Sequence, residues 1–181
     1  MRLARESGKW YVATTEPNLE TRALDKLTRA GFHAYLPIYR EDIHNKRTRT
    51  WRTVHRVLLT GYLFVDVSNG QFGTARNCDG VRGFVGACGI PERVSGKFVE
   101  QFQIAEQDGA FDKLHVKSTA KRDRLLREFH EGSEVQIRVG PFAEFLAIVR
   151  EVTDRAKIRV SFQLFGRDMD VEIEAEHLSA A

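Results

Sequence analysis

Hydrophobic and polar residues follow one another in two different ways along this chain, and the change falls near residue 110. Before it, apolar runs of strand length alternate with stretches whose apolar residues recur at helical spacing. After residue 129, short segments alternate strictly between apolar and polar residues and are separated by turn residues. The pattern predicts an α+β domain over residues 1–110 and an all-β domain over residues 129–181.

The front domain is predicted to be a small sandwich of helices packed on an antiparallel or mixed sheet. The central segment is 58–67, an apolar run with aromatic and β-branched residues, which favours a buried strand over a buried helix. The predicted strands are 9–15, 32–39, 61–67 and 81–86, and the predicted helices are 19–30, 71–79 and 95–108.

The back domain is predicted to be a small β-barrel. Its predicted strands are 134–139, 146–152, 157–162 and 168–174. Short alternating strands joined by tight turns are typical of such barrels. Between the domains, residues 111–128 are basic and poor in large apolar residues, which predicts a linker that becomes helical toward its end. Nucleic-acid contact by this segment, or its packing as a helix over Tyr62, is an alternative.

Charge is distributed unevenly, although the net charge is only +3. Residues 1–128 contain 22 Lys and Arg against 15 Asp and Glu, whereas residues 129–181 contain 6 against 10. A basic front and an acidic back suggest two modules with different partners, or only a difference that serves solubility.

The densest basic segment is 44–56, which contains no acidic residue. Its basic residues are Lys46, Arg47, Arg49, Arg52 and Arg56. Such an arm can neutralise phosphates, and Trp51 and His55 can stack on an unpaired base. We therefore predict nucleic-acid binding at Lys46, Arg47, Arg49 and Arg52. The alternative is an ordinary solvated hairpin tip.

The sequence offers no candidate site for catalysis or for a metal. The six histidines are scattered without metal-ligand spacing, and Cys78 and Cys88 lie in no metal or redox motif. We expect no enzyme activity and no cofactor. The chain has no run of 18 apolar residues and no apolar segment near Met1, so we expect a cytoplasmic protein without a membrane span.

Six motifs together resemble one protein family. In the front domain they are KWYV from Lys9, GYLFV from Gly61 and VRGFVG from Val81. In the back domain they are FxxGxxVxI from Phe129, GPFAxF from Gly140 and VxFxxFGR from Val160. In this order and spacing, over nearly the whole chain, they resemble the NusG family of transcription elongation and antitermination factors.

The resemblance implies an N-terminal NGN domain and a C-terminal KOW domain, an SH3-like barrel. The first binds the clamp helices of the large catalytic subunit of RNA polymerase and touches upstream or non-template DNA. The second recruits partners such as Rho or a ribosomal protein. Carried over to this chain, the polymerase contact falls on Tyr62 and Phe64, with Trp10 a further candidate, and the barrel contact on Phe165 and Arg167. We expect a monomer.

The chain departs from the family pattern at several positions. Thr60 stands where the family usually has Pro, Val139 where it often has Asp, and Ala147 where it usually has Gly. Residues 168–169 replace a common Thr-Pro. These departures favour a specialised paralogue over the housekeeping factor.

Each interpretation has an alternative. Tyr62 and Phe64 are equally compatible with a place in the domain core, and Phe165 with a plug at the barrel end. The alternative function is a KOW-type RNA-binding protein of the ribosome or of translation, although the acidic charge of residues 129–181 disfavours RNA binding there. A structural or adaptor module without a nucleic-acid partner is a third possibility.

Overall fold

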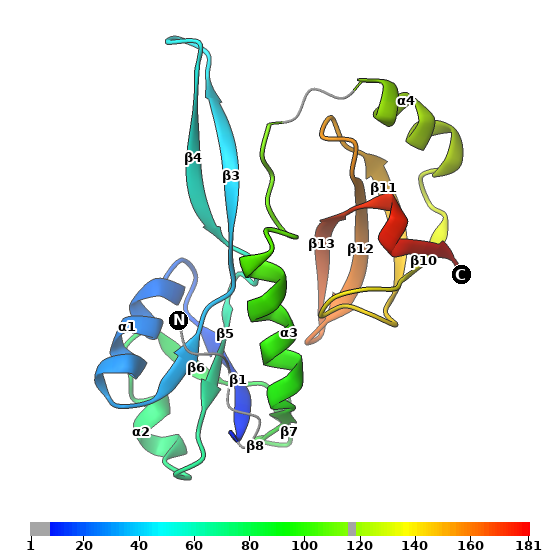
Figure 1. The fold of residues 1–181 in the computed structure, drawn as a ribbon. Helices are drawn as coiled ribbons and strands as arrows, with labels where there is room; N and C mark the ends of the chain where they lie inside the picture. Colours follow the sequence, from blue (N-terminus) through cyan, green and yellow to red (C-terminus); the bar gives the residue numbers. More distant parts are fainter. Residues whose placement is uncertain (1–7, 116–118) are drawn as a thin grey trace. The chain divides into compact units, whose positions relative to one another are not determined.

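The structure is a computed structural model that describes residues 8–115 and 119–181 (Figure 1). Its contacts divide the chain into two compact units. The first contains the chain up to Ile38 together with Arg56–Gln107, and the second contains Tyr39–His55 together with Asp108–Ala181. The basic arm thus groups with the second unit rather than with the front of the chain. The domain bounds 1–110, 111–128 and 129–181 stay a prediction.

The first unit is built on an antiparallel sheet with the strand order β2–β5–β1–β6, and β9 also pairs with β1. Its strands are β1 (Trp10–Thr15), β2 (His33–Tyr35), β5 (Tyr62–Asp66), β6 (Val81–Phe84) and β9 (Arg93–Val94). Two short strands, β7 (Gly86–Ala87) and β8 (Ile90–Pro91), pair separately. The apolar run of the sequence is confirmed as the central strand β5, in which Tyr62 to Val65 are all buried.

Helices cover both faces of this sheet. They are α1 (Glu20–Arg29), α2 (Phe72–Arg76) and α3 (Gly96–Gln107). Leu63 and Val65 form one core with Leu27 of α1. Because side chains alternate along a strand, Phe64 points to the other face, where it contacts Phe102 of α3. The strand β5 therefore lies between two apolar layers.

A buried polar contact fixes α3 over the second face. The hydroxyl of Tyr35 donates to Oε2 of Glu106 on α3 over 2.6 Å, and the ring of Tyr35 stacks on Phe64. Burial, together with the hydrogen bond to the Glu106 carboxylate and its charge, raises the pKa of Tyr35 far above its ordinary value. Tyr35 therefore stays a neutral donor and holds the end of α3 to β2.

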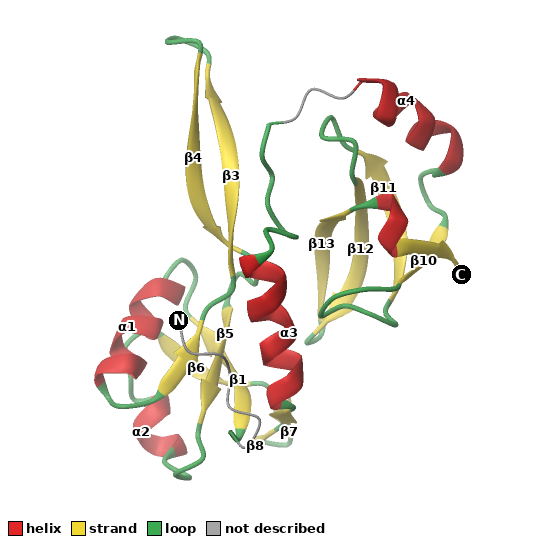
Figure 2. Ribbon diagram, viewed as in Figure 1, coloured by secondary structure: helices red, strands yellow, loops and turns green. Residues whose placement is uncertain are grey.

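The second unit contains a two-stranded ribbon and a small β domain (Figure 2). The ribbon is formed by β3 (Ile38–Asn45) and β4 (Thr50–Val57). The β domain has the strand order β13–β12–β11–β10–β14. Its elements are β10 (Glu134–Ile137), β11 (Leu146–Val152), β12 (Ile158–Leu164), β13 (Arg167–Ile173), a 3₁₀ turn (Ala175–His177) and β14 (Leu178–Ala180). The mixed α and β fold class is confirmed, and β14 is a strand that the sequence pattern did not predict.

The core of the β domain includes the alternating apolar residues that predicted its strands. Ile137, Val149, Ile158 and Val160 are fully buried. The predicted linker contains the helix α4 (Thr119–Glu128), which contacts β11 and buries Leu125. Residues 116–118 of the predicted linker lie outside the described residues.

Candidate functional site

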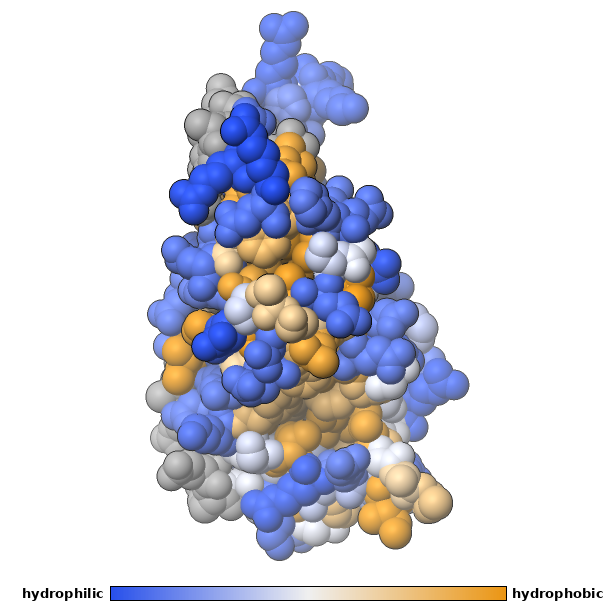
Figure 3. All heavy atoms as spheres, turned by 90° about the vertical axis from the view of Figure 1, so that its right-hand side faces the viewer, coloured by the Kyte–Doolittle hydropathy of each residue, from blue (hydrophilic) through white to orange (hydrophobic). Residues whose placement is uncertain are grey.

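The basic ribbon, defined as β3, β4 and the turn 46–49, contains no buried residue. The predicted nucleic-acid-binding residues Lys46, Arg47, Arg49 and Arg52 are all exposed. In the part of the chain that the structure describes, none of these four forms an ion pair. In Figure 3 the atoms at the top of the molecule, where the ribbon ends, belong to hydrophilic residues. The ribbon therefore brings unneutralised positive charge to its tip.

Asn45 fixes the turn at the tip. Its side-chain Oδ1 accepts the backbone N–H groups of Arg47 over 3.0 Å and of Thr48 over 3.3 Å. Arg49 completes the turn with a left-handed φ of 54°. An Asx turn of this kind substitutes a side-chain acceptor for a backbone one. Because Asn45 already uses these two N–H groups, a ligand at the tip meets side chains.

Residues 109–115, which we call the strap, run beside β3 and bond to it through the backbone. The N–H of Lys113 donates to the carbonyl of Arg40 over 2.7 Å, and the N–H of Asp42 donates to the carbonyl of Lys113 over 3.1 Å. A parallel bridge joins Glu41 to Lys113. The strap thus adds a short third strand to the ribbon.

Two carboxylates hold the strap and the ribbon together. Asp112 accepts the backbone N–H of Arg40 over 2.8 Å and its Nε–H over 2.7 Å, and this hydrogen bond and the opposite charge raise the pKa of Arg40. Asp42 accepts the N–H of His115 over 2.9 Å and the hydroxyl of Thr53 over 2.7 Å. These bonds, together with electrostatic interactions with His115 and Arg155, lower the pKa of Asp42.

Trp51 is not available for base stacking in the way that the sequence predicted. Its ring stacks on His115 of the strap, with centroids 4.0 Å apart and planes inclined by 15°, and also contacts His44. The imidazole of His115 thus occupies a place that an unpaired base was expected to take. Trp51 nevertheless remains 47% exposed, and His55 on the same strand is exposed.

The predicted polymerase-binding residues are buried. Trp10 is 4% exposed, Tyr62 7% and Phe64 0%. The prediction that Phe64 lies on an open face is wrong, because Phe98 and Phe102 of α3 cover its ring at centroid distances of 6.1 and 5.4 Å. The sequence did place Phe98 and Phe102 on one face of a helix, but it did not indicate which sheet face that helix covers.

Phe98 is a candidate that the sequence interpretation missed. It lies in the first turn of α3, where its N–H donates to Oγ of Ser95 over 3.1 Å. Its ring is half-buried and packs edge-on against both Phe64 and Phe102. The first turn lies at the end of the helix, where a side chain can reach the surface. In the sequence, the N-cap residue Ser95 marks where this turn begins.

Phe165 lies in the two-residue turn between β12 and β13. Leu164 pairs with Arg167, and Phe165 and Gly166 both have left-handed φ angles, 52° and 76°. This is the backbone of a type I′ hairpin turn, which favours Asn-Gly and which a bulky residue adopts at a cost of about 1–2 kcal/mol. Phe165 is half-buried and Arg167 is exposed. A bulky residue on a strained turn backbone suggests a functional reason for keeping it.

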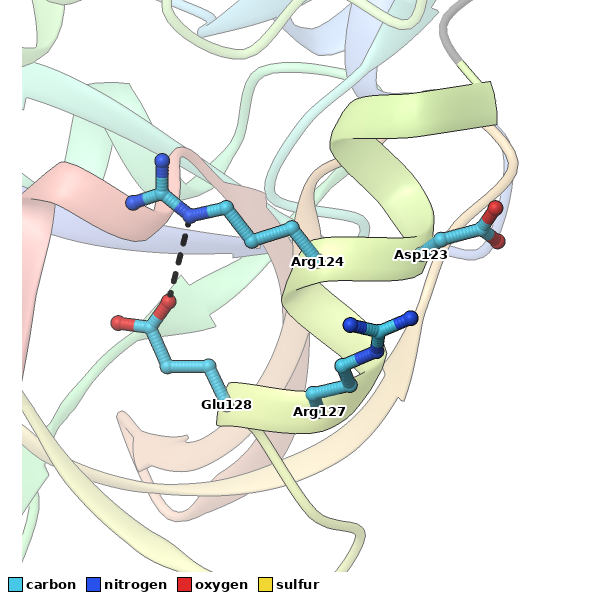
Figure 4. A pocket seen from close by; sticks show the side chains of 4 residues that line it. All are labelled: Asp123, Arg124, Arg127 and Glu128. Carbon is cyan, nitrogen blue, oxygen red and sulfur yellow. Dashed lines mark ion pairs between the residues drawn. The ribbon is translucent and has the colours of Figure 1, made fainter.

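The part of helix α4 whose side chains the structure describes, residues 123–128, shows mixed charge rather than a uniform basic surface. Asp123, Arg124, Arg127 and Glu128 line a shallow cavity of about 370 Å³ (Figure 4). Arg124 Nε lies 3.9 Å from Glu128 Oε2. Because acids neutralise part of this helix, we consider the ribbon the better candidate for a polyanion.

A family model described as "Transcription termination factor nusG" matches residues 8–103, which is just over half of the chain. The chain belongs to the NusG family. The resemblance stated from the sequence motifs is thereby confirmed, and the family consists of transcription factors rather than enzymes.

Full-length NusG relatives align with most of the chain. Proteins named "Transcription termination/antitermination protein NusG" from Halalkalibacterium halodurans and Neisseria meningitidis are each 28% identical, and the alignments cover 91% and 93% of this chain and 94% and 95% of the relatives. A relative of the same name from Streptomyces virginiae is also 28% identical, and here the alignment covers 94% of this chain but only 62% of that protein.

A solved structure shares the fold. The structure described as "Domain interaction in Thermotoga maritima NusG" superposes with a TM-score of 0.62 at 21% identity and covers 96% of this chain and 97% of that one. Among the helices of residues 8–115 and 119–181, none is long and apolar enough to cross a membrane. The predictions of a cytoplasmic location, of a monomer and of a specialised paralogue stay predictions.

Proposed function

We propose that this NusG-family chain is a transcription elongation or antitermination factor with three contacts. Its N-terminal unit binds RNA polymerase, its ribbon touches the upstream or non-template DNA, and its β domain recruits a partner such as Rho or a ribosomal protein. The observation that supports the proposal most is the ribbon tip, where four exposed cations have no ion pair among the described residues. Such charge has no role in the core and fits a polyanion.

Because Phe64 is buried, the surface that contacts the polymerase must be formed by residues that lie over it. We assign the contact first to the half-buried ring of Phe98, which packs on the buried Phe64, and keep the buried Tyr62 and Trp10 as further candidates. Aromatic rings that are backed by packed aromatic neighbours are suited to grip a helical hairpin such as the clamp helices, because little entropy is lost on binding.

A pull-down of RNA polymerase tests this assignment. We expect Phe98→Ala and Tyr62→Ala to weaken capture by about 10-fold or more, the usual cost of an aromatic anchor. Ile104→Ala is the matched control, because Ile104 is an apolar residue of the same helix and is 46% exposed. Folded Phe98→Ala and Tyr62→Ala variants that capture polymerase as well as the Ile104→Ala variant would contradict the assignment.

The salt dependence of DNA binding tests the ribbon. Each phosphate that a cation neutralises contributes about 0.7 to 0.9 to the slope of log affinity against log salt. We therefore expect Arg47→Ala combined with Arg49→Ala to weaken binding to a forked DNA and to reduce that slope by about 1.5. Arg29→Ala, which removes an exposed arginine paired with Asp25, is the control. Unchanged binding in the double variant would favour an adaptor without a nucleic-acid partner.

The Phe165 turn is the proposed contact for the partner of the β domain. Phe165→Asn removes the ring but suits the left-handed backbone, so a loss of partner binding in this variant cannot come from a disrupted turn. The alternative function, RNA binding by the β domain, makes a different prediction. It expects the full chain to keep its RNA affinity when Arg47 and Arg49 are both replaced by Ala.

A further inference from the structure

The strap runs along the edge of the ribbon, and its residue His115 contacts one of the two faces of the ribbon. Trp51 and Thr53 are two residues apart in β4, so they share a face. On that face Trp51 stacks on His115, and Thr53 donates to Asp42, which also accepts the N–H of His115. Arg52, between them in the sequence, points to the opposite face. The strap thus contacts the ribbon on the face with Trp51, and Arg52 lies on the other face.

The strap is held firmly at one end and lightly at the other. At the firm end, Phe111 is buried and packs on Phe142 of the β domain, and the carbonyl of Asp112 accepts a hydrogen bond from Nζ of Lys157 over 3.2 Å. At the other end His115 is exposed, and among the described residues it contacts Trp51 through its stack and Asp42 through its N–H bond. His115 is therefore the part of the strap that can leave at the smallest cost.

We propose that the strap is an intramolecular cover over a base-stacking site, and that Trp51 stacks on an unpaired base of single-stranded nucleic acid when His115 moves away. The inference rests on the proposed contact between ribbon and nucleic acid. The centroid separation of 4.0 Å and the small tilt show that this ring face already accepts a flat heteroaromatic ring. His115 and a base cannot occupy the same ring face at once.

The neighbourhood of Trp51 fits a single strand better than a duplex. Arg49 lies in the turn two residues before Trp51, and a cation next to an aromatic residue is how single-strand-binding surfaces combine backbone attraction with stacking. In a duplex each base is already stacked on its neighbours, so Trp51 gains a partner only where the strands are apart. Trp51 also lies at the surface even with the strap in place, at 47% exposure.

Fluorescence polarisation with a labelled oligo-dT of about 12 nucleotides tests the cover, since single strands bind over stretches of this order. We expect His115→Ala in the full chain to bind the oligonucleotide at least about 5-fold more tightly, the low end of what one base–aromatic stack supplies. His115→Phe is the matched control, because it keeps a ring over Trp51 and is expected to retain the wild-type affinity. A duplex of the same length is expected to show no gain with His115→Ala.

The double variant Trp51→Ala with His115→Ala identifies the ring responsible. We expect it to lose the gain that His115→Ala produces alone, and a gain that persists without Trp51 would overturn the inference. If the wild-type chain binds DNA with the expected salt dependence but His115→Ala binds no better, the cover is wrong and the ribbon function stands. If neither the wild type nor His115→Ala binds, the ribbon function fails and the cover with it.

Hydrogen exchange of the wild-type chain provides a readout that needs no nucleic acid. The strap protects the amide of Lys113, which donates to Arg40, and the amide of Asp42, which donates to Lys113. Exchange of both amides at the rate of an unstructured peptide would overturn the inference directly. Slow exchange of both, together with faster exchange in His115→Ala, would support it.

Discussion

The strand β5 and the basic ribbon are both antiparallel β structures, and they are held in opposite ways. In β5 the residues from Tyr62 to Val65 are buried between helices on both faces, whereas neither strand of the ribbon contains a buried residue. The first is stabilised by apolar burial, which depends on volume and shape. The second is stabilised by directed hydrogen bonds to Asp42 and Asp112 and by one aromatic stack.

The comparison teaches where each region tolerates change. A close-packed strand loses stability with almost any substitution, so it fixes the fold. A ribbon whose side chains are exposed can change its tip without affecting the core, so it is free to specialise toward a ligand. Recognition by this chain is thus separated from the residues that determine its fold.

The largest effect that distinguishes the two regions is expected from removing one ring in each. Phe64→Ala should lower the free energy of unfolding by about 3–5 kcal/mol, because it leaves a cavity among Tyr35, Phe98 and Phe102. Trp51→Ala should lower it by at most about 1.5 kcal/mol, because an exposed ring loses little more than its stack. Urea unfolding followed by circular dichroism measures both. Equal losses would show that the ribbon is part of the cooperative core.

The turn at Phe165 allows a second test of the comparison. Here the removal of a ring should not lower the free energy of unfolding. Phe165→Asn should keep the free energy of unfolding or raise it by up to about 1 kcal/mol, because Asn adopts a left-handed backbone more readily than Phe. Gly166→Ala in the same turn should lower it by about 1 kcal/mol, since no atom crowds the added methyl and only the φ of 76° opposes it. Thermal unfolding of the two variants checks the signs. A destabilised Phe165→Asn would mean that the ring is needed by the barrel end.

A backbone effect of intermediate size is expected at Gly80, just before β6. Gly80 has a φ of 90°, and a methyl group added there would lie 3.1 Å from the backbone nitrogen of Ala23 in α1. Gly80→Ala should therefore lower the free energy of unfolding by about 1–3 kcal/mol. Gly70→Ala, with a φ of 72° and no atom within 4 Å, separates the strain of the backbone from the crowding. Equal losses in the two variants would show that crowding at Ala23 is unimportant.

The smallest effect concerns pH and the ribbon. The pKa of Asp42 lies below its ordinary value of 3.8, because His115 and Thr53 donate hydrogen bonds to the charged carboxylate. A lowered pKa in the folded state means that Asp42 stabilises the ribbon fully above pH 3.8 and loses this contribution as the pH falls through the lower, folded value. NMR titration of the Asp42 carboxyl carbon measures the shift. Thr53→Ala should move that pKa back toward 3.8, and an unchanged titration would exclude Thr53 as a cause.

Much of the fold was predictable because apolar burial leaves a periodic signal. The run that became β5 and the alternation that became β10 to β13 each arise from a face that must avoid water. The ribbon strands left no such signal, because both of their faces are exposed and their residues need not alternate. The sequence showed a basic arm there and left a solvated hairpin only as an alternative.

The candidate sites were predictable in composition but not in exposure. The cations of the tip are exposed, as an arm without acidic residues suggested. The cover over Phe64 comes from α3, more than 30 residues later in the chain, and the ring over Trp51 comes from His115, more than 60 residues later. Contacts between residues so far apart depend on the tertiary arrangement, which a pattern of neighbouring residues does not contain.

The Asx turn at Asn45 has a consequence for how the proposed factor would choose its targets. Two backbone donors at the tip are already engaged, so the phosphate contacts are made by long, freely rotating Lys and Arg side chains. Such side chains bind a nucleic-acid backbone of any base sequence. Such contacts do not favour one DNA sequence over another. A protein built in this way would move with the transcribing enzyme across whatever genes it enters, and any preference for particular operons would have to be supplied by another molecule.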